Sequence, residues 1–197
     1  MPYSIGSYLA IISFLKLQHV FWHVFPLVVK ADVLAAGKGV YICKNYAEGE
    51  IAVKEIFGGK FGIAKELLVE EFLSGEEMSY FVICDGKDYK FFGTAQDHKR
   101  VGEGDKGKNT GGMGCYSPSR LFTSRLLEKI NMKIVNPTLN AINDLGTTYK
   151  GFLYVGLMLK DNEPYLVEFN VRMGDPECQT LLPLLNCLLY TSPSPRD

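Results

Sequence analysis

The amino-terminal half of the chain alternates short apolar segments with glycine-containing turns. Leu27–Lys30 and Val40–Cys43 are predicted strands, and the turn Ala35-Ala-Gly-Lys-Gly39 joins them into a hairpin. In Ala47–Phe57 the apolar residues recur at helical spacing with charged residues between them, and Gly58-Gly59 follows as a helix-ending signal. The pattern therefore predicts a hairpin followed by a helix.

A second series of strands follows this helix. Leu67–Leu73 and Met78–Cys84 have strand patterns, and Asp85-Gly86 predicts a tight turn into a return strand at Tyr89–Phe92. Thr94–Pro118 has no apolar period and is dense in Gly, Asp, Lys and Asn. We therefore predict a long loop there, and long loops in compact domains are usually functional or disordered.

The last third of the chain predicts a helix, a hairpin and a short helix. Thr123–Leu145 has a helical pattern, with a kink expected at Pro137. Phe152–Lys160 and Tyr165–Val171 are predicted strands, joined by a turn at Asn162-Glu-Pro164. Gln179–Leu189 is an apolar helix candidate, which the Pro/Ser-rich tail is not expected to continue.

The composition is that of an ordinary globular protein, since 47% of the 197 residues are hydrophobic and 22% are charged. A formal net charge of −1 supplies no positive field for nucleic acid or an acidic membrane surface. The apolar runs Ile5–Leu15 and Val20–Val29 are shorter than the roughly 18–20 residues of a membrane-spanning helix. We expect neither a nucleic-acid nor a membrane partner. The five cysteines lack metal-ligand spacing, and buried thiols in a reducing cytoplasm are expected.

The strongest candidate for chemistry is the segment Tyr165-Leu-Val-Glu-Phe-Asn-Val-Arg172. Alternate side chains of a strand share a face, so Glu168, Asn170 and Arg172 are expected to point the same way. A carboxylate beside an amide oxygen suits Mg²⁺, and an arginine suits phosphate or carboxylate. The alternative is the solvated face of an amphipathic strand. The acidic turn at 173–177 and a neighbouring apolar strand, which indicates a central place in the sheet, favour a binding site.

Lys30 and Lys38 flank the glycine turn of the first hairpin. Glycines allow backbone N–H groups to approach phosphate oxygens closely, and two lysines would neutralise a polyphosphate. The turn is not a Walker A loop, because the pattern GxxxxGK[ST] is absent. A surface hairpin with exposed lysines is the alternative interpretation.

The long loop carries two motifs with polar groups suited to a phosphorylated sugar, Gln96-Asp-His-Lys-Arg100 and Asn109-Thr-Gly-Gly-Met-Gly114. Gly102-Glu-Gly-Asp-Lys-Gly107 formally matches GxGxxG, but no strand and helix frame it, so we reject a dinucleotide site. His98 is expected to have no role of its own. Glu70-Glu-Phe-Leu73 joins two predicted strands and suits an adenine pocket, the alternative being a plain strand end.

The order of these motifs resembles that of the glycinamide ribonucleotide synthetase family, whose catalytic domain has the ATP-grasp fold. The resemblance covers about Pro26 to Leu188 and rests on the segments Val29–Gly39, Ile56–Gly62, Glu70–Glu77, Ala95–Gly102, Asn109–Gly114, Gly151–Met158 and Glu168–Gln179. The segments Ala95–Gly102 and Asn109–Gly114 distinguish this ligase family from more distant ATP-grasp enzymes. The resemblance implies an α+β fold of two lobes: a glycine-loop lid at 26–71 and a core lobe with a mixed or antiparallel sheet at 72–188.

The resemblance also implies a reaction. The family joins glycine to 5-phosphoribosylamine at the expense of ATP, through a glycyl phosphate, and releases glycinamide ribonucleotide, ADP and phosphate in purine biosynthesis. Phosphoryl transfer of this kind depends on positioning and charge neutralisation rather than on a protein nucleophile. Mg²⁺ or Mn²⁺ is the expected cofactor, ATP the co-substrate and the cytoplasm the expected location.

Roles carry over from the family position by position. The expected ATP-binding residues are Lys30, Gly37, Lys38, Gly39, Glu70, Glu71, Phe72, Leu73 and Glu77. The expected metal ligands are Glu168 and Asn170, and the expected catalytic residues are Arg172, at the transferring phosphate, and Asp175, at the glycine amine. The residues expected to contact phosphoribosylamine are Asp97, Lys99, Arg100, Asn109, Thr110, Gly111 and Gly112.

The chain departs from the family in three places. Val33 stands where the family usually has glycine, which would stiffen or distort the lid turn. Residues 1–25 and 189–197 do not resemble the family, and its amino- and carboxy-terminal domains are not found in the chain. We therefore expect a fragment with foreign sequence at both ends. A fragment that binds Mg-ATP without ligating, and an ATP-grasp ligase with another acceptor, are the alternatives.

Overall fold

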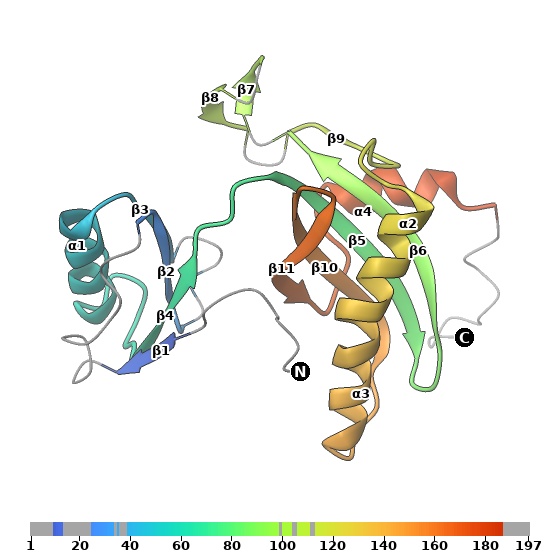
Figure 1. Ribbon diagram of the computed structural model, residues 1–197, viewed down its shortest axis with the longest axis horizontal. Coiled ribbons are helices and arrows are strands. Elements are labelled where there is room, and N and C mark those ends of the chain that lie inside the picture. Colours follow the sequence, from blue (N-terminus) through green and yellow to red (C-terminus); the bar gives the residue numbers. More distant parts are fainter. Residues whose placement is uncertain are drawn as a thin grey trace, which may run out of the picture. The chain divides into compact units, whose positions relative to one another are not determined.

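The computed structural model describes residues 10–13, 25–33, 35, 39–98, 100–103, 106–110 and 113–186. The chain divides into two compact units, Met1–Ser74 and Gly75–Asp197 (Figure 1). Each unit has a hydrophobic core of its own, and each core is built on an antiparallel sheet. The two units are described in turn below.

The first unit is a four-stranded antiparallel sheet with one helix. Its strands, in the order β1–β4–β2–β3, are β1 (Ala10–Ser13), β4 (Glu66–Glu71), β2 (Leu27–Ala31) and β3 (Val40–Cys43). α1 (Tyr46–Phe57) begins after Asn45, whose side chain accepts a hydrogen bond from the Glu48 N–H, and it ends at Gly58. The predicted hairpin, helix and glycine stop are confirmed.

Gly39 closes the β2–β3 hairpin, because its carbonyl accepts a hydrogen bond from the Ala31 N–H at 2.8 Å. A Cβ on Gly39 would lie 2.8 Å from the Cβ of Ala35 and 3.0 Å from that of Ala31, so a larger residue does not fit without displacement. Val33 lies in a bend of this turn. Among the described non-glycine residues only Asp161 and Asn162 have positive φ, so Val33 does not occupy the left-handed region that favours glycine.

The second unit is built on a five-stranded antiparallel sheet of order β11–β10–β5–β6–β9. Its strands are β5 (Glu76–Asp85), β6 (Tyr89–Asp97), β9 (Cys115–Tyr116), β10 (Lys150–Lys160) and β11 (Glu163–Asn170). We expected Tyr165–Val171 to lie centrally, and this is wrong. β11 is an edge strand. Among the described residues it pairs only with β10, and β10 pairs with β5 on its other side.

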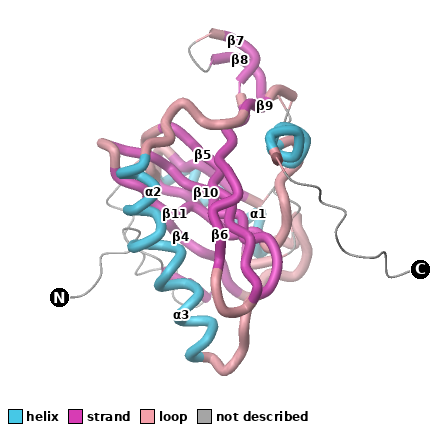
Figure 2. Tube along the Cα trace, turned by 90° about the vertical axis from the view of Figure 1, so that its right-hand side faces the viewer, coloured by secondary structure: helices cyan, strands magenta, loops and turns pink. Residues whose placement is uncertain are grey.

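A long helical segment covers one face of this sheet (Figure 2). α2 (Ser124–Ile130), the π-helical η2 (Asn131–Val135) and α3 (Asn136–Asp144) together confirm the predicted helix. The Asn136 N–H bonds to the Asn131 carbonyl five residues back, just before Pro137. This widened turn accommodates the proline ring, and it lies at the place where we expected a kink.

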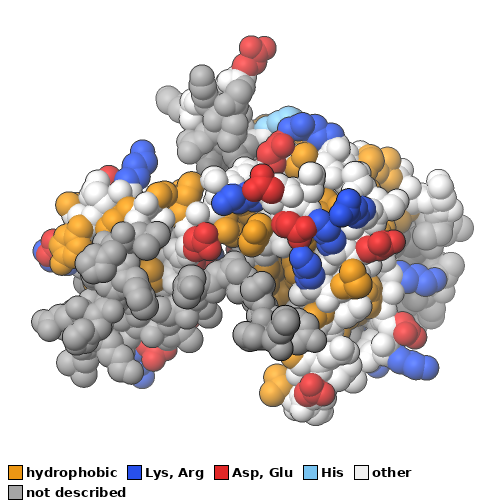
Figure 3. Space-filling view, in the orientation of Figure 1, with side chains coloured by type: hydrophobic (Ala, Val, Ile, Leu, Met, Phe, Trp, Pro, Cys, Tyr) orange, Lys and Arg blue, Asp and Glu red, His pale blue; other side chains and the backbone are white. Residues whose placement is uncertain are grey.

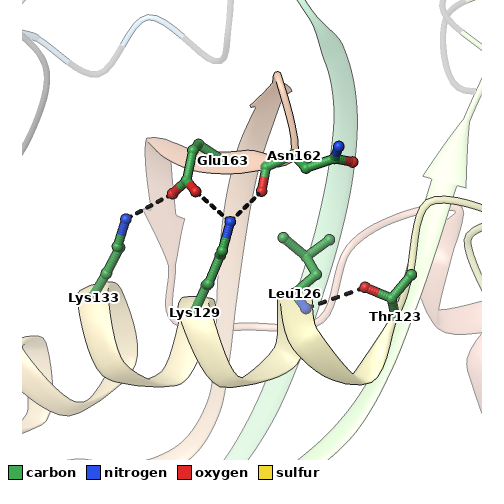
Figure 4. A network of polar contacts seen from close by, with 6 residues as sticks. All are labelled: Thr123, Leu126, Lys129, Lys133, Asn162 and Glu163. Atoms are coloured by element: carbon green, nitrogen blue, oxygen red, sulfur yellow. Dashed lines mark hydrogen bonds and ion pairs between the residues drawn. The ribbon is translucent and has the colours of Figure 1, made fainter.

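Two lysines connect this helical segment to the β10–β11 hairpin (Figure 4). Lys129 forms an ion pair with Glu163 and donates to the Asn162 carbonyl at 2.9 Å. Lys133 pairs with the other Glu163 oxygen at 2.6 Å. The hydroxyl of Thr123 caps α2 by accepting from the Leu126 N–H. The contacts of Lys129 and Lys133 anchor the turn end of the β10–β11 hairpin to the helical segment.

The opposite face of the sheet carries α4 (Glu177–Leu181) and the 3-10 turn η3 (Leu182–Leu184). We expected one helix over Gln179–Leu189, and this is corrected. The helix begins two residues earlier and ends at Leu181, because Pro183 cannot donate to an α-helical hydrogen bond. Residues 187–189 lie outside the described residues. Leu181 packs with Phe81 and Ala95 in a small core of its own.

Two loop predictions are also corrected. The β10–β11 turn consists of Asp161 and Asn162, with φ of 53° and 59°, while Glu163 and Pro164 already belong to β11. Asp and Asn are favoured in such two-residue turns because they tolerate positive φ. Thr94–Pro118 is not a continuous loop, because β6 runs on to Asp97 and is followed by β7 (Arg100–Gly102), β8 (Lys106–Asn109) and β9. These strands carry no apolar alternation, so the pattern did not reveal them.

Acidic and basic side chains are interspersed over the face shown in Figure 3, which fits the net charge of −1. Cys43 and Cys84 are buried free thiols, and burial raises the pKa of both. Cys115 and Cys178 are free and partly buried. In the part of the chain that the structure describes, no helix is long and apolar enough to cross a membrane.

Candidate functional site

The two faces of strand β5 differ in content. Met78, Tyr80 and Val82 belong to the core under α2 and η2. Successive side chains of a strand alternate, so Glu77 and Ser79 point to the other side of the sheet, the side of α4. Strand pairing extends this second face across the sheet, as the register of the neighbouring strands shows.

One row of residues crosses the sheet through Ser79. Ser79 pairs with Ala95 of β6 and with Gly156 of β10, and Gly156 pairs with Glu168 of β11. Directly paired residues of antiparallel strands share a face. Glu168, far from Ser79 in the sequence, therefore lies on the same face two strands away.

A cavity of about 70 Å³ is lined mainly by residues of this face. The lining residues are Glu77, Met78, Ser79, Asp97, Tyr154, Gly156, Leu157, Val167 and Glu168. Three of them are acids, and they come from β5, β6 and β11. Liquid water occupies about 30 Å³ per molecule, so the cavity admits a group of a few heavy atoms and not a whole nucleotide.

Gly156 makes room for this arrangement. A Cβ at this position would lie 3.1 Å from the Cγ of Glu168 and 3.2 Å from a ring carbon of Tyr154. The β10–β11 register also shifts between Gly156 and Leu157. A bulge of this kind redirects neighbouring side chains. The small residue and the bulge together let the Glu168 side chain lie against β10.

Glu168 and Asn170 point the same way, as strand alternation predicts. The Asn170 Nδ2 donates to Glu168 Oε1 at 3.0 Å. The remaining oxygens, Glu168 Oε2 and Asn170 Oδ1, are hard donors that fit Mg²⁺, which takes few protein ligands and completes its shell with phosphate and water oxygens. Within the described residues no group of three or more His, Cys, Asp and Glu side chains could hold a metal. A metal at this pair would therefore depend on phosphate oxygens.

Arg172 and Asp175 lie on the turn between β11 and α4. β11 ends at Asn170, so strand alternation does not set the direction of Arg172. The exposed guanidinium of Arg172 donates to the Met173 carbonyl at 3.0 Å. The exposed carboxylate of Asp175 accepts from the Gln179 Nε2 at 2.8 Å. Contacts with Met173 of the turn and with Gln179 of α4, rather than the strand, orient the two expected catalytic residues.

The two motifs of the predicted loop are hydrogen-bonded to each other. The His98 N–H donates to the Gly114 carbonyl at 2.9 Å, and the Thr110 hydroxyl donates to the His98 carbonyl. Gln96 Oε1 accepts from the hydroxyls of Tyr116 and Ser119 and thereby anchors the end of β6. The hydroxyl of Thr110, one of the expected substrate contacts, is thus engaged within the protein.

The other expected substrate contacts divide into two groups. Asp97 lines the cavity. Lys99, Gly111 and Gly112, and the side chains of Arg100 and Asn109, lie outside the described residues. Gly102 pairs with Lys106 in the β7–β8 ribbon, so the GxGxxG match joins two strands, in keeping with our rejection of a dinucleotide site.

The first unit holds the remaining expected nucleotide residues. Lys30 of β2 and Glu70 of β4 form an ion pair at 2.6 Å, with 21% and 19% of their side chains exposed. Glu71 ends β4, and Phe72 and Leu73 follow in a partly buried irregular segment. Gly37 and Lys38 lie outside the described residues. Two of the expected ATP-binding side chains, Lys30 and Glu70, are therefore in direct contact.

Sequence reasoning missed three residues on the cavity side: Ser79, Tyr154 and Glu177. The Ser79 hydroxyl lies 3.1 Å from the Tyr154 hydroxyl and 3.1 Å from Glu177 Oε1. Ser79 is a polar residue in the middle of an otherwise apolar strand, and this was a signal that could have identified it. Nothing in the local pattern distinguishes Glu177 from the exposed acids around it.

Residues 10–178 match the family model of the ATP-grasp (A) domain of phosphoribosylglycinamide synthetase. The chain belongs to this family. The expected α+β ATP-grasp fold is thereby confirmed. The match begins inside the segment 1–25, which we expected to lie outside the family, and β1 of that segment pairs with β4.

Individual relatives agree with the family match. The phosphoribosylamine–glycine ligase of Mesorhizobium japonicum is 51% identical over 158 residues, which are 80% of this chain and 37% of that protein. The crystal structure of this ligase from Thermotoga maritima matches with a TM-score of 0.76 at 34% identity, over 89% of this chain and 46% of that one. The D-alanine–D-alanine ligase of Bacillus anthracis (TM-score 0.61, 19% identity, 86% of this chain and 52% of that one) shows the fold alone. The chain spans less than half the length of these two phosphoribosylamine–glycine ligases.

Proposed function

We propose that this chain carries the nucleotide-binding and phosphoryl-transfer part of an enzyme that ligates glycine to 5-phosphoribosylamine. The observation that supports this best is the gathering of Glu77, Asp97 and Glu168 around one cavity. These acids come from three separate family motifs, and only the folded sheet brings them together. Family membership supplies the reaction class, that of an ATP-dependent ligase.

The proposed reaction has two steps. A glycine carboxylate oxygen attacks the γ-phosphorus of ATP. The bond from that phosphorus to the bridging oxygen breaks, and ADP leaves with the electron pair of this bond. The nitrogen of phosphoribosylamine then attacks the carbonyl carbon of glycyl phosphate, loses a proton and displaces phosphate. Neither step needs a protein nucleophile, so the side chains act by orientation and charge.

In this proposal Glu168 and Asn170 hold Mg²⁺ or Mn²⁺ through the two free oxygens described above. A bound metal would neutralise charge on the phosphate oxygens. Arg172 stabilises the transferring phosphoryl group, and Asp175 accepts a hydrogen bond from the glycine amine. Both are exposed on the turn after β11, where a substrate can reach them.

The nucleotide and the acceptor have separate contacts. Lys30 and Lys38 neutralise the phosphates, the glycine turn at 37–39 covers them, the segment Glu70–Leu73 lines the adenine site, and Glu77 accepts from the ribose hydroxyls. The residues of the β6–β9 region proposed for phosphoribosylamine are Asp97, Lys99, Arg100, Asn109, Thr110, Gly111 and Gly112. Asp97 is supported by its place in the cavity wall.

Mg-ATP binding without ligation is the second candidate. It is favoured by the length of the chain, which covers 37% of a curated relative such as the Mesorhizobium japonicum ligase. Residues beyond the matched region in that relative could supply contacts to glycine and phosphoribosylamine. Ligation by this chain alone would require that it bind glycine and phosphoribosylamine by itself.

A coupled assay for ADP release tests both candidates. Release that requires glycine and phosphoribosylamine together supports the ligase. Binding of Mg-ATP without turnover supports the second candidate. Turnover with glycine and a different amine, but not with phosphoribosylamine, would contradict the proposed acceptor.

A further inference from the structure

The buried side of α4 carries a polar cluster to which the proposed reaction assigns no role. Glu177, the first residue of α4, is 7% exposed, and Ser79 of the central strand β5 is 4% exposed. The Ser79 hydroxyl is 3.1 Å from Glu177 Oε1 and 3.1 Å from the Tyr154 hydroxyl. Burying a carboxylate is costly unless donors are held around it. We call these three residues the Ser79 clasp.

The single hydrogen of the Ser79 hydroxyl determines how the clasp is connected. An ionised Glu177 can only accept, so Ser79 donates to Glu177 and accepts from Tyr154. The Tyr154 ring also packs edge-on against Phe81, with ring centroids 5.0 Å apart. Tyr154 lines the cavity, so Glu177 acts through Ser79 to hold a group of the cavity wall.

Glu177 also holds the turn that carries Asp175. The backbone of Gly174 passes so close to the carboxylate that a Cβ there would lie 2.1 Å from Glu177 Oε2. The Cys178 N–H donates to the Gly174 carbonyl at 3.0 Å. The Gly174 backbone thus lies against the Glu177 carboxylate, and the bond to Ser79 attaches this carboxylate to β5, the central strand of the sheet.

We propose that Glu177 is a positioning residue that holds the Asp175 turn and Tyr154 in place and thereby sets the affinity for the amino-acid substrate rather than for the nucleotide. The inference rests on the proposed function, in which Asp175 faces the glycine amine. Arg172 lies on the same turn but is proposed to act on the phosphoryl group during transfer. The proposed contacts to the ribose and the other phosphates come from elsewhere, from Glu77 at the start of β5 and from Lys30 on β2. Loss of the Ser79 clasp should therefore weaken the binding of glycine more than the binding of ATP.

Kinetics on the full chain test this difference. Glu177→Ala should raise the KM for glycine about tenfold, the scale of one lost hydrogen bond to a charged group, and leave the KM for ATP within about twofold. Glu177→Gln keeps the shape and one acceptor oxygen, so it should recover most of the affinity. Gly174→Ala leaves the carboxylate in the protein but displaces it from Ser79, so it should behave like Glu177→Ala. Should Glu177→Ala not fold, Ser79→Ala replaces it.

The matched control is Tyr80→Phe. It removes a buried hydrogen bond from the opposite face of the same strand, that from the Tyr80 hydroxyl to Asn131 Oδ1 at 2.8 Å. It should leave both KM values unchanged. A rise of the two KM values together in Glu177→Ala, or an equal rise of the glycine KM in Tyr80→Phe, overturns the positioning role.

Amide hydrogen exchange separates failure of this inference from failure of the proposed function. Exchange of the amides in 174–180, relative to those of β5, should be faster in Glu177→Ala and Gly174→Ala but not in Tyr80→Phe. If the wild-type chain releases no ADP, glycine affinity is measured instead by titration calorimetry in the presence of Mg-ATP. Faster exchange together with weaker glycine binding in Glu177→Ala then supports the inference, and only the ligase proposal fails. Glycine binding that is equal in the two chains overturns the inference. Unchanged exchange in 174–180 overturns the inference. Faster exchange with an unchanged glycine KM in an active chain also overturns it, since the clasp would then be structural only.

Discussion

The helix-covered face and the cavity face of the second sheet differ in what their side chains contribute. On the first, Met78, Tyr80 and Val82 pack in a continuous apolar core with α2 and η2. On the second, Glu77 and Ser79 of the same strand line a cavity with acids from β6 and β11. Strand alternation thus lets one segment contribute stability on one side and polar chemistry on the other.

The two faces also satisfy their polar groups differently. The helix face buries the Tyr80 hydroxyl, whose partner is Asn131, and burial raises the pKa of Tyr80. The cavity face buries the Glu177 carboxylate, whose donor, the Ser79 hydroxyl, in turn accepts from the Tyr154 hydroxyl. Among the described residues, no buried side-chain nitrogen or oxygen lacks a hydrogen-bond partner. Within the described part of the chain, the buried polar groups of both faces are therefore paired. The second face gathers three acids around its cavity.

The largest expected effect is on the cavity face. Glu168→Ala removes the carboxylate of the proposed Mg²⁺ pair, so Mg²⁺-dependent nucleotide binding, measured by titration calorimetry, should fall below detection. Glu168 is exposed, so the free energy of unfolding should change by less than about 0.5 kcal/mol. Glu128→Ala, an exposed carboxylate on α2, is the control and should bind normally. Unchanged binding in Glu168→Ala would refute the metal assignment.

A truncation on the helix face should have the reverse effect. Ile130 is fully buried between α2 and the sheet. Ile130→Ala should lower the free energy of unfolding by about 3 kcal/mol, measured by urea denaturation, and leave nucleotide affinity unchanged. The control is Met132→Ala, because Met132 is 64% exposed. Weaker nucleotide binding by folded Ile130→Ala would show that the two faces are not independent.

A smaller change on the helix face sharpens the comparison with Ser79. Tyr80→Phe keeps the ring, which packs against Phe91, and removes only the bond to Asn131. The free energy of unfolding should fall by about 1 kcal/mol. Urea denaturation of Ser79→Ala should give a larger loss than that of Tyr80→Phe, because it leaves the buried Glu177 carboxylate without its donor. A loss above about 3 kcal/mol in Tyr80→Phe would mean that the hydroxyl does more than bond to Asn131.

The smallest effect concerns the ion pairs of Glu163 (Figure 4). Hydrogen bonds from Lys129 and then Lys133 lower the pKa of Glu163 to about 2. A lowered folded-state pKa stabilises the protein above the unfolded value near 4.5, and this contribution is lost as the pH falls through about 2. The difference in unfolding free energy between the wild type and Glu163→Gln should therefore be constant above about pH 5 and shrink below it.

This pH effect should be modest, because the ion pairs are accessible to solvent and salt. Denaturation curves at several pH values between 6 and about 2 would measure it. Lys44→Gln, a cation on the first unit, is a suitable control and should leave the pH dependence unchanged. A wild-type-minus-variant difference that stays constant down to the lowest pH would contradict the assignment.

The sequence by itself determined the elements that depend on neighbouring residues. The hairpin of β2 and β3, the asparagine cap and glycine end of α1, and the common direction of Glu168 and Asn170 all follow from local geometry. The ordered motifs also identified the family. Local patterns fail where composition conceals a strand, as in β7 and β8. They also misplace a turn, as between β10 and β11, where the observed turn begins at Asp161, one residue before the predicted one.

Only the tertiary structure decided which distant residues meet. Glu77, Asp97 and Glu168 share a cavity because β5, β6, β10 and β11 pair in a register that no local pattern encodes. The edge position of β11 and the burial of Glu177 depend on the same pairing. Strand order is set by hydrogen bonds between segments far apart in the chain, and residue types alone do not specify those partners. The motifs proposed for nucleotide chemistry were thus visible along the sequence, whereas the Ser79 clasp exists only in the folded sheet.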